Sequence, residues 1–262
     1  MLKTLVKHEV KSTGRVMCAV YAIFAVATVL ACIFGFLGRH TGDNGISSGF
    51  WSIPLIFYAV TLMILMVASL IYLCWRFYYT MYSAQGYLTH TLPVKTSWIL
   101  NCKILVSACF FLIACVACTV SMAITGAVVT GEGIGVIIDV IKLTVSEGAK
   151  TFHMHQVLFV IFVAAIMCLA ILNYLLMFFA GSSIGQLSKR SKGAAGIAAG
   201  IGLYYASQII TIIFIVVGYV FLRQFIVPDR VVLFLVTALE VLWVTVYYLI
   251  SRVILVRHLN LE

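Results

Sequence analysis

The sequence predicts an all-α, polytopic membrane protein: one transmembrane domain over residues 1–262, with six transmembrane helices and an N-terminal amphipathic interfacial helix. Composition is the first observation behind this prediction. The chain is 64% hydrophobic and 10% charged, whereas soluble domains are about 45–50% apolar and about 25% charged. The second observation is a series of six long apolar runs. The third is the uneven distribution of basic residues between the loops that join these runs.

The six apolar runs predict six membrane-spanning helices. They cover about residues 16–38, 53–75, 104–129, 157–180, 197–222 and 231–251. Each run reaches the roughly 20 residues that a helix needs to cross the hydrocarbon core, and backbone groups cannot stay unpaired there, so we expect helices and not strands. The first run is too long for the core of a signal peptide and has no convincing cleavage site. We therefore expect it to remain in the mature protein.

The distribution of Lys and Arg orients these helices. Twelve of the 17 basic residues fall in the N-terminal segment, the loops at about 76–103 and 181–196, and the C-terminal tail. The other five fall in the opposite loops, close to five acidic residues. By the positive-inside rule, we expect a multi-pass protein of the plasma membrane with both termini in the cytoplasm. The net charge of +9 then reflects loops that face anionic lipid, and we expect no nucleic-acid partner.

Two segments outside the spans carry amphipathic patterns. In residues 1–15, three lysines recur every four residues and four apolar side chains lie on another face. These residues are Lys3, Lys7 and Lys11, and Leu2, Leu5, Val6 and Val10. The pattern predicts an interfacial helix with its lysines toward anionic lipid; a solvated basic terminus is the alternative. The outer loop at 130–156 contains GVIIDVIKLTVSEGAK, for which we expect a short surface helix.

Metal, redox and catalytic sites are not expected. The eight cysteines lie in or beside the apolar runs, where thiols serve as small packing residues. Cys115-x-x-Cys118 has no second ligand pair, and His153-x-His155 has no third ligand nearby. The chain contains no G-x-x-x-x-G-K-[ST] phosphate-binding loop. No span contains a histidine or a pair of acids that would serve an intramembrane protease, so we expect neither an enzyme nor a cofactor bound to this chain.

Weakly polar side chains form a stripe on two of the predicted helices. The stripe in the second span consists of Tyr58, Thr61, Ser69 and Tyr72, and the stripe in the fifth span consists of Tyr204, Gln208 and Thr211. The residues of each stripe share one helical face. Such stripes suit a pathway for an amphipathic cargo, and interhelical hydrogen bonds are the alternative interpretation.

Gly196, Gly200 and Glu240 are candidates for helix packing. Glycines four residues apart let two helix backbones approach closely, either inside the chain or at a subunit interface. Glu240 is the only acid deep in a span, and a charge there costs about 2.5–3.5 kcal/mol, so its side chain should face protein or water. We expect a structural hydrogen bond from Glu240 to a neighbouring helix; a proton-coupling role is the alternative.

The segment YSAQGYLTHTLPVKTSW, residues 82–98, joins the second and third spans and is too apolar for a simple solvent loop. Gly86 favours a turn, and Pro93 disfavours helix at Leu92. The residues between them form a short bounded element in which Leu88 and Leu92 share a face. Exposed apolar side chains of this kind are typical of a surface that binds a partner.

Two stretches of the chain carry a resemblance to a known family. They are RFYYTMYSAQGYLTHTLPVKTSWILNCKIL, residues 76–105, and the C-terminal YYLISRVILVRHLNLE. With the six-span layout, they resemble the small bacterial permease subunits of type-2 ABC exporters, in which the loop between the second and third spans reads GYL…TLPV. The resemblance covers the whole chain, and outside these stretches it rests on hydropathy.

The resemblance implies a transport function and a set of partners. In such exporters the loop after the second span forms a coupling helix that docks in a groove of a separate cytoplasmic ATPase subunit. The implied coupling residues here are Gln85, Gly86, Tyr87, Leu88, Thr89, His90, Thr91, Leu92 and Pro93. Two permeases, as a homodimer or heterodimer, and two ATPases form the transporter, with the pathway between spans two and five of facing protomers. ATP and magnesium would bind the ATPase, and cargoes of the family include peptides, lantibiotics, drugs and lipid-linked molecules.

Two functions of other classes compete with the exporter. One is a proton-coupled secondary transporter that uses Glu240. It predicts internal repeats with broken helices, and the sequence shows no convincing repeat. The other is a non-transporting membrane protein, such as an immunity protein or a scaffold. An ATPase gene in the neighbouring reading frame would favour the exporter over both.

Overall fold

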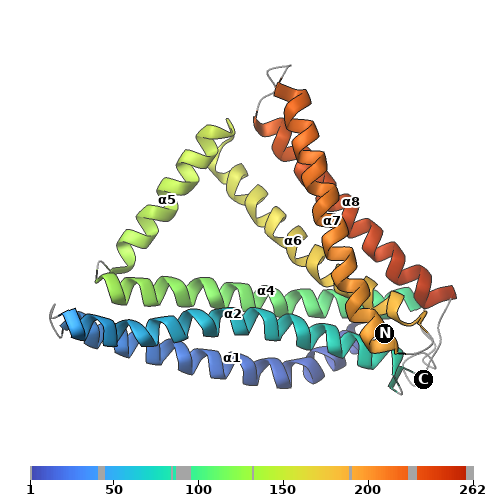
Figure 1. Cartoon of the computed structure of the whole chain (residues 1–262), viewed down its shortest axis with the longest axis horizontal. Helices are drawn as coiled ribbons and strands as arrows, with labels where there is room; N and C mark the ends of the chain where they lie inside the picture. Colours follow the sequence, from blue (N-terminus) through green and yellow to red (C-terminus); the bar gives the residue numbers. More distant parts are fainter. Residues whose placement is uncertain are drawn as a thin grey trace. The chain divides into compact units, whose positions relative to one another are not determined.

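The computed structural model describes residues 2–40, 45–83, 85–86, 96–131, 133–188, 191–223 and 229–257. In these residues it contains seven helices and no strand, which confirms the all-α prediction. The helices are α1 (Leu2–His40), α2 (Gly45–Tyr82), α4 (Thr96–Thr130), α5 (Gly133–Thr151), α6 (Gln156–Gly185), α7 (Lys192–Arg223) and α8 (Asp229–Arg257). Figure 1 shows them coloured in chain order.

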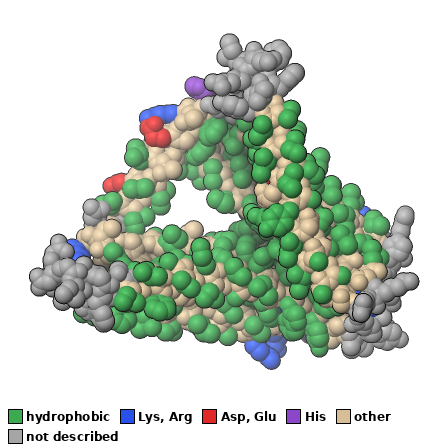
Figure 2. Space-filling view, in the orientation of Figure 1, with side chains coloured by type: hydrophobic (Ala, Val, Ile, Leu, Met, Phe, Trp, Pro, Cys, Tyr) green, Lys and Arg blue, Asp and Glu red, His purple; other side chains and the backbone are tan. Residues whose placement is uncertain are grey.

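Six of these helices are long and apolar enough to cross a membrane. The candidate spans are Lys3–His40, Ile53–Tyr82, Thr96–Thr130, Gln156–Gly185, Lys192–Gly218 and Val231–Val256. Each contains one of the six runs read from the sequence, except that the fifth run extends to residue 222. Hydrophobic side chains cover most of the face shown in Figure 2, as expected for helices whose outer surface meets lipid tails. The six-span prediction is confirmed.

The seventh helix, α5, confirms the surface helix expected in the outer loop. Its charged side chains form two i,i+3 ion pairs, Lys142 with Asp139 at 3.6 Å and Lys150 with Glu147 at 2.9 Å. Figure 2 shows acidic and basic side chains together over α5. Apolar side chains such as Ile138 and Ile141 are also exposed, so α5 has the amphipathic surface that its sequence predicted.

The N-terminal amphipathic segment is helical as predicted, and it continues into the first span without a break. Residues 2–40 form the single 39-residue helix α1. Lys3, Lys7 and Lys11 are exposed, while Leu5 and Val6 are partly buried. The segment is therefore an extension of the first span.

The chain divides into two compact units. One consists of residues 7–72 and 109–146, and in it α1, α2 and α4 run side by side. Its core holds Phe24 and Ala31 of α1, Tyr58 and Leu65 of α2, and Cys118 of α4. Hydrogen bonds add to this packing: the Tyr21 hydroxyl donates to the carbonyl of Phe110 at 2.6 Å.

The other unit consists of residues 1–6, 73–108 and 147–262. Here α6 packs against both α7 and α8. The end of α2 and the start of α4 belong to the same unit. They extend well beyond the predicted spans, which ended at residue 75 and began at residue 104, because their further residues are buried against protein and not in lipid.

Candidate functional site

The segment between α2 and α4 is the strongest candidate for a functional element, and the structure describes its two ends. Tyr87–Pro93, the larger part of the implied coupling residues, lie outside the described residues. Gln85 and Gly86 are described. The Gly86 N–H donates to the carbonyl of Ser83 at 2.6 Å. Residues 85–86 are in helical conformation, so the role of Gly86 as a turn stays a prediction.

Exposed aromatic side chains flank this segment. Trp75 and Tyr79 of α2 stack with ring centroids 5.3 Å apart, and Trp98 lies on the first turn of α4. All three are exposed. Trp and Tyr concentrate at the membrane–water interface, where one edge of the ring meets lipid and the polar edge meets water. Exposed aromatics at residues 75, 79 and 98 are therefore the kind of side chains found at a membrane–water interface.

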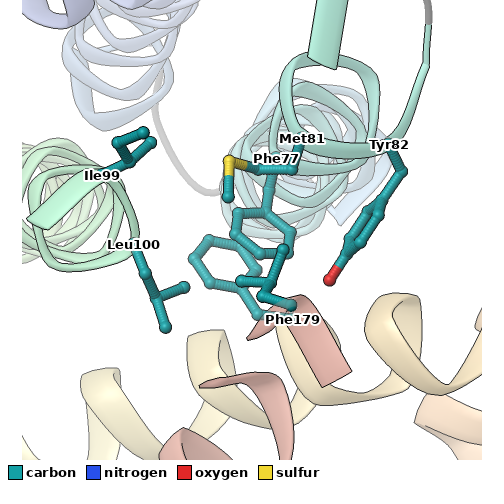
Figure 3. Close-up of a cluster of buried hydrophobic side chains, with 7 residues drawn as sticks. Phe77, Met81, Tyr82, Ile99, Leu100 and Phe179 are labelled. Carbon is teal, nitrogen blue, oxygen red and sulfur yellow. The ribbon is translucent and has the colours of Figure 1, made fainter. Parts of the chain in front are cut away.

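A buried cluster holds both ends of the segment in place. Its members are Phe77, Met81 and Tyr82 of α2, Ile99 and Leu100 of α4, Phe179 of α6, and Leu255 of α8. We call these seven residues the hairpin mount. None of them is more than 3% exposed, and all but Leu255 are labelled in Figure 3. Four helices therefore converge at the base of the segment.

Ring stacking and hydrogen bonds in the hairpin mount fix how α2 packs against α6. The Phe77 and Phe179 rings stack with centroids 4.0 Å apart and an interplanar angle of 8°. The Tyr82 hydroxyl donates to the Ser183 hydroxyl at 2.7 Å, and Ser183 donates to the carbonyl of Phe179 at 2.8 Å. Figure 3 shows Tyr82 extending from α2 toward α6. A buried hydrogen bond of this kind has a defined geometry, so it selects one register between α2 and α6.

Lys103 is buried in a helix, whereas the sequence predicted it in a loop. We counted it as a basic residue of the loop, but it lies in α4 and is only 5% exposed. Its ammonium group donates to the Thr80 hydroxyl at 2.7 Å, which joins α4 to α2. The signal for this contact was weak in the sequence, since a Lys at the end of an apolar run usually extends to the membrane surface.

Gly196 and Gly200 pack inside the chain. A Cβ built on Gly185 of α6 would lie 2.4 Å from the Cα of Gly196, and one on Gly181 would lie 2.5 Å from the Cα of Gly200. The two helix backbones are thus in contact at two glycine pairs, which answers the open question in favour of intrachain packing. We missed Gly181 and Gly185, although they have the same four-residue spacing.

Glu240 makes a hydrogen bond to a neighbouring helix, as expected. The Asn173 side-chain amide of α6 donates to one carboxylate oxygen of Glu240 on α8. Both side chains are partly buried. A polar pair between two membrane helices stabilises their contact because the alternative for each group is hydrocarbon. Asn173 was not singled out from the sequence.

The stripe of the second span faces the packed side of α2. Tyr58 and Ser69 are buried, and the Tyr58 hydroxyl hydrogen-bonds the Ser121 hydroxyl of α4. Thr61 donates to the carbonyl of Phe57 in its own helix at 2.8 Å, and Tyr72 is partly buried. Interhelical bonding therefore accounts for Tyr58, and a pathway role for the stripe stays a prediction.

The stripe of the fifth span is more accessible. Tyr204 is exposed, and Gln208 and Thr211 are partly buried. The Thr211 hydroxyl accepts a hydrogen bond at 3.3 Å from the indole N–H of Trp243 on α8. Thr211 therefore contacts α8, whereas Tyr204 lies on the exposed surface of α7.

Among the cysteines and histidines, Cys118 packs in a core and His155 caps a helix. All eight cysteines are free thiols, and Cys118 belongs to the core of α1, α2 and α4. Nδ1 of His155 accepts from the N–H of Val157 and caps α6, and His153 occupies a turn at φ 50°. Within the described ranges, no group of three His, Cys, Asp or Glu residues is arranged to hold a metal ion.

Comparison of the chain with protein-family models, with curated proteins and with solved structures gave no match. The assignment of function therefore depends on the geometry of this chain's own residues.

Proposed function

We propose that this chain is the permease subunit of a type-2 ABC exporter, which moves an amphipathic cargo out of the cytoplasm with energy from a separate ATPase subunit. One observation carries the proposal: the helix ends on both sides of the semi-apolar segment, in α2 and α4, are buried in the hairpin mount together with residues of α6 and α8. The GYL…TLPV pattern of that segment supports it from the sequence.

The physical requirement for coupling is stiffness. A partner that hydrolyses ATP performs work on a membrane protein only if the element it pushes does not yield locally. Protein interiors packed at crystal-like density transmit displacement with little loss. Here the ends of the segment join α2 and α4, and the Phe77–Phe179 stack and the Tyr82–Ser183 hydrogen bond join α2 to α6.

The glycine pairs connect α6 to α7. Since α6 contacts α7 backbone to backbone at Gly185–Gly196 and Gly181–Gly200, movement of α6 is passed to α7 with no flexible side chain between them. A push at the segment would thereby reach both α2 and α7, the second and fifth spans. In the proposed transporter these spans of two facing permeases form the cargo pathway, and the exposed side of α7 near Tyr204 is its candidate lining.

In this proposal ATP and magnesium bind the partner ATPase, because the chain has no phosphate-binding loop of its own. Membrane lipid and a second permease complete the assembly. Glu240 already has a partner in Asn173, so the proposal assigns it no proton-coupling step.

The test is purification of the tagged full chain from its own membranes in a mild, uncharged detergent. We expect an ATPase with a phosphate-binding loop to be retained in equal amount, and ATP hydrolysis to rise when the complex is placed in lipid with cargo. Transport in sealed vesicles that requires a proton gradient and continues without ATP would contradict the proposal. Failure to retain any ATPase, with the chain folded, would favour an immunity or scaffold role.

A further inference from the structure

A continuous line of basic side chains runs along the N-terminal part of α1. Lys3, Lys7, Lys11 and Arg15 recur every four residues, and all four are exposed. We call these four residues the basic stripe. Lys and Arg side chains project from α1 at the lower edge of Figure 2. The stripe extends the lysine pattern read from the sequence by Arg15, which lies directly before the first apolar run.

The opposite side of this helix segment packs against protein. Thr13 and Met17 are buried, at 1% and 0% exposure. Each follows a stripe residue by two positions, which corresponds to about 200° around a helix. A Cβ on Gly14 would contact the Phe110 ring of α4 at 3.4 Å. The rotation of α1 is thus set by its packing, and this rotation directs Lys7, Lys11 and Arg15 away from the unit of residues 7–72 and 109–146.

The stripe is also uncompensated along its own helix. Glu9 is the single acid of α1, and it lies two residues from both Lys7 and Lys11, on the opposite side. Like charges at i,i+4 destabilise an isolated helix. Four of them in sequence point to an external anionic partner that offsets this repulsion.

The length of α1 places the stripe at the membrane surface. A helix of 39 residues is about 58 Å long, whereas the hydrocarbon core is about 30 Å thick and each headgroup layer adds about 5–8 Å. With residues 16–38 in the hydrocarbon, Arg15 lies at its edge. Lys11 then lies about 6 Å further out, Lys7 about 12 Å and Lys3 about 18 Å.

We propose that the basic stripe binds the headgroups of anionic phospholipids in the leaflet at the N-terminal end of α1. Arg15 and Lys11 contact headgroup phosphates directly. Lys7 reaches the same layer by extending its aliphatic stem back toward the membrane. Lys3 acts through the surface potential, which falls off over a Debye length of about 8 Å at physiological salt. The inference does not rest on the exporter proposal.

The position of the basic stripe next to a membrane span favours a membrane surface over an acidic protein as its binding partner. The stripe continues directly into a membrane span, so two of its four cations lie at headgroup depth, where lipid is already present at high local concentration. Each Lys or Arg near an anionic surface strengthens binding by about fivefold. The contributions should decrease from Arg15 to Lys3, a gradient that a patch for a soluble protein would not produce.

The experiment is native mass spectrometry of the full chain from uncharged detergent that contains equal amounts of phosphatidylglycerol and phosphatidylcholine. We expect the wild type to retain phosphatidylglycerol preferentially. Arg15→Gln with Lys11→Gln should lower that preference by at least about tenfold, and Lys3→Gln with Lys7→Gln by less than about fivefold. The matched control is Lys142→Gln with Lys150→Gln on α5, two exposed cations that pair with acids of their own helix; it should change nothing.

Three outcomes would overturn the inference. The first is an unchanged lipid preference in the Arg15/Lys11 variant. The second is displacement of the lipid by millimolar inorganic phosphate, which would indicate a site for a soluble anion. The third is loss of a co-purifying protein with the lipid preference intact, which would assign the stripe to a protein partner. Elution volume and thermal unfolding in uncharged detergent check folding, and Arg15→Gln and Lys11→Gln made singly replace the double variant if it does not fold.

Discussion

Gly185 of α6 and Gly196 of α7 lie in direct backbone contact: a Cβ added to Gly185 would stand 2.4 Å from the Cα of Gly196. Real Cβ atoms do not approach other atoms so closely, so the two helices must separate if either glycine pair gains a side chain. The same holds for Gly181, whose Cβ would stand 2.5 Å from the Cα of Gly200. This contact is the closest approach between helices that the described glycines show.

The first prediction concerns these glycines. Gly185→Ala or Gly181→Ala should lower the free energy of unfolding by about 3 kcal/mol, the upper part of the range for overpacking, because the obstacle is backbone. Gly196→Leu with Gly200→Leu should also destabilise the folded chain. Gly202→Ala on α7, where nothing lies within 4 Å of an added Cβ, should have no such effect. Unfolding in a detergent–denaturant titration, followed by circular dichroism, measures all four; equal stability of Gly185→Ala and Gly202→Ala would contradict the packing.

A second prediction concerns Glu240 and Asn173. Glu240→Gln should keep folding and, in the proposed exporter, ATP-driven transport largely intact, because the amide oxygen still accepts the hydrogen bond from Asn173. Asn173→Leu should lower the free energy of unfolding by about 0.6–2 kcal/mol, as for other interhelical hydrogen bonds in membranes. Transport in proteoliposomes and unfolding by denaturant are the measurements. Loss of transport in Glu240→Gln with normal assembly and normal ATP hydrolysis would show that the carboxylate itself is required.

The third prediction tests the segment between α2 and α4. If the chain is the proposed permease, Tyr87→Ala with Leu92→Ala should leave it inserted and folded but unable to retain or stimulate an ATPase. Each buried apolar side chain of this size contributes about 1.5–3 kcal/mol, enough to decide whether a partner stays bound. The control is Ile141→Ala with Leu143→Ala, a pair of exposed apolar side chains on α5. Co-purification followed by cargo-stimulated ATP hydrolysis separates the two; a wild-type result for the Tyr87/Leu92 variant would remove the segment as the coupling element.

A fourth prediction tests the hairpin mount, which holds the ends of the segment, separately from the segment itself. Phe179→Ala should lower the free energy of unfolding by about 3–5 kcal/mol, since it empties the centre of the hairpin mount. Tyr82→Phe should lower it by only about 0.5–1.5 kcal/mol, the net value of its hydrogen bond to Ser183. If the mount transmits force, Tyr82→Phe should retain the ATPase but reduce the stimulation of ATP hydrolysis by cargo. Full stimulation in this variant would show that the hydrogen bond has no role in coupling.

The elements that could be predicted from the sequence depend on local free energies. Whether a segment of about 20 residues enters the membrane is decided by the transfer free energies of its own side chains. The six spans could therefore be located without knowledge of their neighbours. The helix α5 followed from the same kind of reasoning, because its apolar residues recur with a helical period.

Tertiary structure alone decided which helix faces meet. Hydropathy does not distinguish a side chain against lipid from one against another helix, since both surroundings are apolar. For this reason the sequence left open whether Gly196 and Gly200 faced the same chain, and Asn173 could not be paired with Glu240. Lys103 was assigned to a loop although it is buried beside Thr80, because the end of a helix depends on what its last turns pack against. The sequence by itself determined the six spans and their order. The choice of contact faces, which forms the hairpin mount, was decided by side-chain shape and by hydrogen bonds between residues as far apart as Tyr82 and Ser183.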